Sequence, residues 1–86
     1  MNHNNINNTA ELHLTQKERI YLAIRQMESP SQSDIHKATG IARHLIPDRV
    51  LRLIDAGKVA VNGKKIDPDT KREVFVYGVN ESLNAG

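Results

Sequence analysis

The sequence predicts a small α+β domain in which three helices are followed by a β-hairpin. In three segments before residue 57, apolar residues recur at helical spacing. Two runs of β-forming residues follow, "VAV" at 59–61 and "EVFVY" at 73–77, with turn-forming residues between them. Because the chain has 86 residues, we expect one domain at most.

The first helix is expected at about residues 16–28. Thr15 is a good N-cap, and Glu18 stands three residues further on, which is the spacing of a capping box. Apolar residues recur at helical spacing from Ile20 onward. Pro30 cannot continue a helix, so the helix is expected to end just before it.

The second helix is expected at about residues 32–39. Ser31 is a suitable N-cap, and Asp34 occupies the third helical position, which again fits a capping box. Ile35 and Ala38 form a narrow apolar face. Gly40 is well placed to close the helix in a left-handed conformation.

The third helix is expected at about residues 45–56, preceded by a loose turn. Its apolar stripe consists of Ile46, Val50, Leu53 and Ile54. Pro47 would break a helix interior but is tolerated in the first turn, which places the start of the helix near residue 45. Gly57 supplies the stop.

Two turns are expected in the hairpin region. Asn62-Gly63 is a strong tight-turn signal. The segment "DPDT" at 67–70 is a second turn, with Pro68 at a suitable position. We expect residues 14–79 to form the ordered domain, 1–13 a disordered Asn-rich arm and 80–86 a flexible tail.

Composition argues against several classes of protein. Without cysteine the chain has no disulfides, thiolate metal sites or cysteine nucleophiles. No apolar run approaches a membrane span, and the N-terminus lacks the order of a signal peptide, so a cytoplasmic protein is expected. The four histidines form no ligand pair on one helix face, and no nucleophile elbow or phosphate loop occurs. We therefore expect no metal, no cofactor and no enzymatic activity.

Positive charge is concentrated in the second half of the chain. Residues 1–40 carry equal numbers of acidic and basic side chains, whereas residues 41–79 carry eight basic against five acidic ones. Such asymmetry suggests an anionic partner, although an ordinary solvated surface would also explain it.

The order of these elements resembles the winged helix-turn-helix family. The segment "SQSDIHKATGIARHLIPDRVLRLIDAGKV" is similar to the helix-turn-helix of MarR-type bacterial regulators, and "DPDTKREVFV" looks like the segment that returns from their wing. The chain lacks their long flanking helices and resembles minimal regulators of the plasmid and phage kind. The resemblance implies a sequence-specific DNA-binding transcriptional regulator, with the third helix in the major groove and a basic wing on the phosphate backbone.

The partner implied by the resemblance is double-stranded DNA, without a membrane. The candidate contacts come from the start of the second helix, the third helix and the wing: Gln32, Ser33, Arg43, His44, Arg49, Arg52, Lys64, Lys65, Lys71 and Arg72. A monomer reads only a few base pairs, so a homodimer or a partner regulator is expected.

Other interpretations remain open. Arg49 and Arg52 could instead form helical ion pairs with Asp48 or Asp55, and the wing lysines could serve solubility alone. A winged helix can also bind only proteins, as an adaptor or as an inhibitor of another regulator. Finally, "RLIDAGKVAVNGKKI" resembles the S4 family of RNA-binding modules, although the scarcity of aromatic residues argues against RNA recognition by base stacking.

Overall fold

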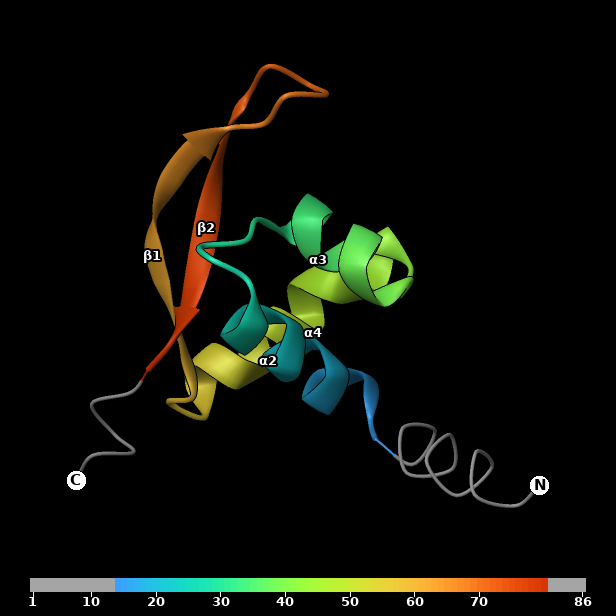
Figure 1. The fold of residues 1–86 in the computed structure, drawn as a ribbon. Helices are drawn as coiled ribbons and strands as arrows, with labels where there is room; N and C mark the ends of the chain where they lie inside the picture. The colour runs from blue at the N-terminus through green and yellow to red at the C-terminus, as the bar shows by residue number, and fades with distance from the viewer. Residues whose placement is uncertain (1–13, 81–86) are drawn as a thin grey trace.

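The computed structural model describes residues 14–80. Within them, three α-helices precede a two-stranded antiparallel sheet: α2 (Gln16–Gln26), α3 (Gln32–Thr39), α4 (Ile46–Asp55), β1 (Val59–Ile66) and β2 (Glu73–Val79). This order confirms the α+β prediction. The hairpin stands along one side of the helices, and its tip extends beyond α3 (Figure 1). The arm predicted at 1–13 and residues 81–86 of the predicted tail lie outside the described residues.

Both predicted capping boxes are present. At the start of α2, the Thr15 amide donates to Glu18 Oε1 at 2.8 Å and the Glu18 amide donates to Thr15 Oγ1 at 3.0 Å. At the start of α3, the Ser31 amide donates to Asp34 Oδ2 at 3.0 Å and the Asp34 amide donates to Ser31 Oγ at 3.2 Å. These bonds satisfy amides that have no partner inside the helix.

The helix ends depend on the backbone conformation of single residues. Gly40 closes α3 with a φ of 74°, as predicted, and Gly57 follows α4 with a φ of 77°. The first helix ends at Gln26, two residues earlier than predicted, because Met27 already has an extended backbone. Ser29 then has a left-handed φ of 49°, and the chain bends over residues 27–29 before Pro30.

A short 3₁₀ turn precedes α4, where the sequence predicts a loose turn. It spans Arg43–Leu45, and regular helix begins at Ile46 with Pro47 in the first turn. The proline therefore costs no helical hydrogen bond. The regular helix is one residue shorter at each end than the predicted 45–56.

The predicted tight turn at Asn62-Gly63 is wrong. Both residues lie inside β1, which continues to Ile66. The strand register shifts between Val61 and Gly63, so Asn62 is the extra residue of a β-bulge. Gly63 has a φ of 140°, which side-chain-bearing residues rarely adopt.

The bulge is held by a contact that is distant in sequence. Asn62 Nδ2 donates to Ser29 Oγ at 2.9 Å, so the bulged residue ties the hairpin to the connection between α2 and α3. The Asn62 side chain passes Gly78 of β2, where an added Cβ would meet Asn62 Nδ2 at 3.3 Å. The Asn-Gly pair therefore serves tertiary packing instead of chain reversal.

Chain reversal occurs at the second predicted turn, which the structure places between the strands. The Asp67 amide donates to the Arg72 carbonyl and the Lys71 amide donates to the Asp67 carbonyl, each at 2.8 Å. The Asp67 carboxylate also accepts the Thr70 amide at 2.8 Å. This backbone hydrogen bond lowers the pKa of Asp67 from its ordinary value, so the ionised form of this carboxyl group is favoured in the turn.

The hydrophobic core lies between the helices and the base of the hairpin. It is formed mainly by aliphatic side chains: Ile20, Ile24, Ile35, Ile41, Ile46, Val50, Leu53, Val59 and Tyr77. Ala38, which the sequence groups with Ile35 on a narrow apolar face, is exposed. The Tyr77 amide donates to the Pro30 carbonyl at 2.9 Å, so the Pro30 segment flanks β2 on the edge that β1 leaves free.

Candidate nucleic-acid interface

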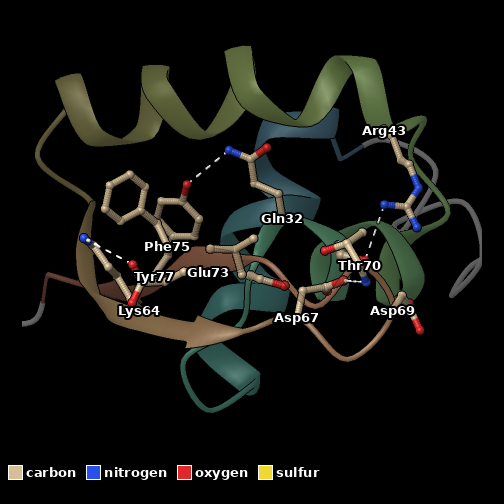
Figure 2. A pocket seen from close by; sticks show the side chains of 12 residues that line it. Gln32, Arg43, Lys64, Asp67, Asp69, Thr70, Glu73, Phe75 and Tyr77 are labelled. Atoms are coloured by element: carbon tan, nitrogen blue, oxygen red, sulfur yellow. Dashed lines mark hydrogen bonds and ion pairs between the residues drawn. The ribbon is translucent and has the colours of Figure 1, made fainter.

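A cleft of about 610 Å³ lies between the helices and the wing, defined here as residues 59–79. The start of α3 contributes Ser31, Gln32 and Ser33 to its lining, and Arg43 contributes from the turn before α4. In Figure 2, Arg43 and Asp69 lie towards one end of the cleft, and Lys64 and Phe75 towards the other. The cleft therefore joins elements that are more than thirty residues apart in the chain.

The helical wall of the cleft carries hydrogen-bond donors. Gln32 Nε2 donates to the Tyr77 hydroxyl at 3.1 Å, which links the start of α3 to β2 (Figure 2). Arg43 Nη1 donates to Ser33 Oγ at 3.4 Å, near the limit of a hydrogen bond. Because this contact is weak, the Arg43 guanidinium can turn to an incoming acceptor at little cost.

The wing wall combines charge with apolar surface. Lys64 Nζ lies 3.7 Å from Glu73 Oε1 and 5.5 Å from the centre of the Phe75 ring. The ammonium group is therefore attracted by both a carboxylate and the face of an aromatic ring. Phe75 remains 52% exposed, so apolar surface is available beside this lysine.

Two ion pairs connect the wing to α3. Lys65 Nζ of β1 pairs with Asp34 Oδ2, and Lys37 Nζ of α3 pairs with Asp69 Oδ2 at 2.9 Å. Burial alone would raise the pKa of Asp34, but the hydrogen bonds from Lys65 and the Ser31 amide outweigh it, and the pKa is lowered. The Lys37–Asp69 pair is more than half exposed, so it adds little stability.

The outward face of α4 carries a shared ion pair. Asp48 Oδ2 accepts from Arg49 Nη1 and from Arg52 Nε, each at 2.9 Å. The hydrogen bond from Arg52 is the largest cause of a pKa for Asp48 that lies below its ordinary value. The helical ion pairs considered as an alternative from the sequence are thus present, with Asp48 as the acceptor for both arginines.

The tip of the wing presents cations without an acidic partner among residues 14–80. Lys71 and Arg72 are exposed, and no carboxylate of the described chain pairs with either side chain. Their backbone groups are fixed by Asp67, as described above. Two positive charges are therefore held on an ordered loop and are free to meet an anion.

The cleft brings together four of the ten residues predicted as contacts, namely Gln32, Ser33, Arg43 and Lys64. The remaining six do not line it: His44, Arg49, Arg52, Lys65, Lys71 and Arg72. His44 is exposed in the turn before α4.

Sequence reasoning missed the part of the lining contributed by β2. Glu73, Phe75 and Tyr77 all line the cleft, as do Asp67 and Asp69 of the turn. The alternation in "EVFVY" was the available signal, because residues two apart on a strand share a face. The lining is consequently more acidic and more apolar than the sequence suggested.

Residues 14–80 contain neither a cluster of metal-ligating side chains nor a membrane-spanning helix. That part of the chain contains no group of three or more His, Cys, Asp or Glu side chains placed to hold a metal ion. None of its helices combines the length and apolar character needed to cross a bilayer.

Comparison with known proteins gives evidence at the level of the fold. No protein-family model matches the chain, and no curated protein sequence matches it. The structure is similar to the crystal structure of wild-type MarR from E. coli in its apo form, with a TM-score of 0.60 at 19% sequence identity. The match covers 88% of this chain but 54% of that one, so the chain spans about half of the MarR chain. The likeness confirms a MarR-like winged-helix fold.

Proposed function

We propose that the chain is a sequence-specific DNA-binding transcriptional regulator. One observation supports this most strongly: the start of α3, the turn that leads into α4 and the wing all border one cleft. Arg43 and Lys64 are therefore presented to the same partner. An extended polyanion could contact cations from all three elements at once.

Each element has a separate role in this proposal. The exposed face of α4 enters the major groove, where Arg can bind guanine O6 and N7 with two hydrogen bonds. Gln32 and Ser33, at the start of α3, donate to a phosphate. Lys71 and Arg72 at the tip of the wing contact the backbone further along, as do Lys64 and Lys65 once they leave their acidic partners.

The proposal extends to the molecular context. A single copy would cover only a few base pairs, so a homodimer or a partner regulator is proposed. We place the protein in a bacterial, plasmid or phage setting and in the cytoplasm, because its fold resembles MarR and its sequence contains no cysteine. Neither catalysis nor a cofactor is part of the proposed function.

A second candidate function is protein binding, which the exposed apolar residues favour. Leu51 of α4 is 55% exposed, and Ile66 and Phe75 of the wing are 60% and 52% exposed. Aromatic side chains are enriched in protein interfaces. The acidic residues that line the cleft would also suit a basic peptide better than a phosphate.

Titration of labelled nucleic acids distinguishes these functions. The protein would be titrated against a pool of random duplex DNA and a structured RNA at about 50 and 200 mM salt. The proposal predicts preference for duplex DNA and weaker binding at the higher salt. Preference for the RNA would favour the S4-like alternative, and no binding to either at tens of micromolar protein would favour the protein-binding function.

A further inference from the structure

The arginines of α4 share one carboxylate in the free protein. Asp48 Oδ2 lies 2.9 Å from both Arg49 Nη1 and Arg52 Nε. The Asp48 side chain is 47% exposed and that of Arg52 is 66% exposed, so this cluster lies on the surface. A helix that only needed to attract DNA would gain by leaving both arginines unpaired.

Phosphates and base edges differ in how strongly they repel the carboxylate of this cluster. When Arg49 or Arg52 binds a phosphate, the Asp48 carboxylate beside it is brought close to a polyanion, which repels it. The edge of a guanine carries no net charge, so an arginine can bind it without this repulsion. Asp48 can also accept a hydrogen bond from the N4 amino group of the cytosine in the same pair.

We propose that Asp48 is a specificity-determining residue that holds Arg49 and Arg52 away from phosphates and directs α4 to G·C pairs in the major groove. This inference rests on the proposed function, because it assumes that α4 meets duplex DNA. Asp48 acts in part through its arginines and in part by direct contact with cytosine. Its effect is to weaken binding to DNA of arbitrary sequence.

The substitution Asp48→Asn removes the charge while keeping the size of the side chain. It frees two cations, so affinity for a random duplex of about 20 base pairs should rise about tenfold at low salt. Affinity for a duplex selected by the wild-type protein from a random library should stay about unchanged, because loss of the contact with cytosine offsets the gain from the freed cations. The ratio of the affinity for the selected duplex to that for the random duplex should therefore fall about tenfold.

Asp55→Asn is the matched control, because it removes the same charge from the same helix. The Asp55 side chain is exposed and has no hydrogen bond or ion pair within residues 14–80, and its charge acts on Arg52 only at longer range. It should change the ratio by less than about twofold. Asp48→Glu retains the carboxylate and should restore most of the wild-type ratio. Circular dichroism during heating would establish that all three variants fold.

The possible outcomes separate this inference from the function on which it rests. If the wild-type protein binds duplex DNA and Asp48→Asn leaves the ratio unchanged, the role of Asp48 is overturned and the proposed function stands. Equal effects of Asp48→Asn and Asp55→Asn would show a general charge effect and would also overturn it. If the wild-type protein binds no duplex, the function and the inference fail together.

Discussion

The wing tip provides the most direct quantitative prediction. Lys71 and Arg72 are exposed and have no acidic partner within residues 14–80, whereas Lys64 and Lys65 are paired with Glu73 and Asp34. The double substitution Lys71→Gln and Arg72→Gln removes two charges without touching the backbone hydrogen bonds to Asp67. The turn should therefore keep its shape, and any change in DNA binding reports on charge.

The magnitude follows from the release of counterions. Each phosphate neutralised by the protein contributes about −0.9 to the slope of log affinity against log salt. Loss of two contacts should make the slope shallower by about 1.8. Between about 50 and 200 mM salt, the wild-type affinity should thus fall by about tenfold more than that of the double variant.

Fluorescence anisotropy with a labelled random duplex, measured at several salt concentrations, gives the slope. Lys17→Gln with Arg25→Gln is the matched control, because it removes two exposed charges of α2 that do not line the cleft. The control should leave the slope within about 0.5 of the wild-type value. If the wing variant keeps the wild-type slope, or if the control changes it equally, the wing does not contact phosphates.

Three further predictions concern the scaffold that supports the interface. Ser31→Ala removes the hydroxyl that caps α3, at a residue that is 1% exposed. Urea unfolding should show that the free energy of unfolding falls by about 1–2 kcal/mol. An unchanged unfolding midpoint would contradict the importance of this cap. Gly40→Ala places a Cβ at a φ of 74° with no atom within 4 Å of it, so the substitution introduces backbone strain without a steric clash. In the same assay, the free energy of unfolding should fall by about 1 kcal/mol. A stabilised protein would contradict this reasoning. The pKa of Asp34 is lower in the folded protein than its ordinary value. The ionised carboxylate therefore stabilises the fold fully at pH values above about 4, and this stabilisation is lost as the pH falls below that value. Thermal unfolding should show a smaller acid-induced loss of stability for Asp34→Asn than for the wild type, and parallel pH profiles would rule out this role.

Local patterns predicted the helices well, because their determinants lie within a few residues of each other. Thr15 with Glu18 and Ser31 with Asp34 form both capping boxes at a separation of three residues. Pro47 fixed the start of α4 through its own geometry. None of these features depends on the rest of the fold.

The hairpin was harder to predict, because distant contacts decide its shape. Asn62-Gly63 has the composition of a tight turn, but the partner of Asn62 is Ser29, thirty-three residues earlier in the chain. The pair lies inside β1 beside this distant partner, against the local preference of the dipeptide for a turn. From the sequence alone, the turn and the bulge could not be distinguished.

The candidate site also combines contacts between residues close together in the chain with contacts between distant ones. The pairing of Arg52 with Asp48 spans four residues of one helix and was considered from the sequence. The pairing of Lys65 with Asp34 spans thirty-one residues and depends on how the wing lies against α3. The sequence therefore predicted the ion pairs between residues close together in the chain, whereas those between distant residues required the tertiary structure.

The central claim is that the start of α3, the turn before α4 and the wing form one surface for duplex DNA. Two-dimensional NMR of the amides during titration with a duplex tests it most directly. The account predicts that Leu22 and Met27 of the separate groove between α2 and α3 stay unchanged. Shifts should concentrate at the start of α3, the turn before α4, the exposed face of α4 and the wing tip, at Gln32, Ser33, Arg43, Arg49, Arg52, Lys71 and Arg72. Shifts confined to that groove, or absent at saturating DNA, would contradict the claim.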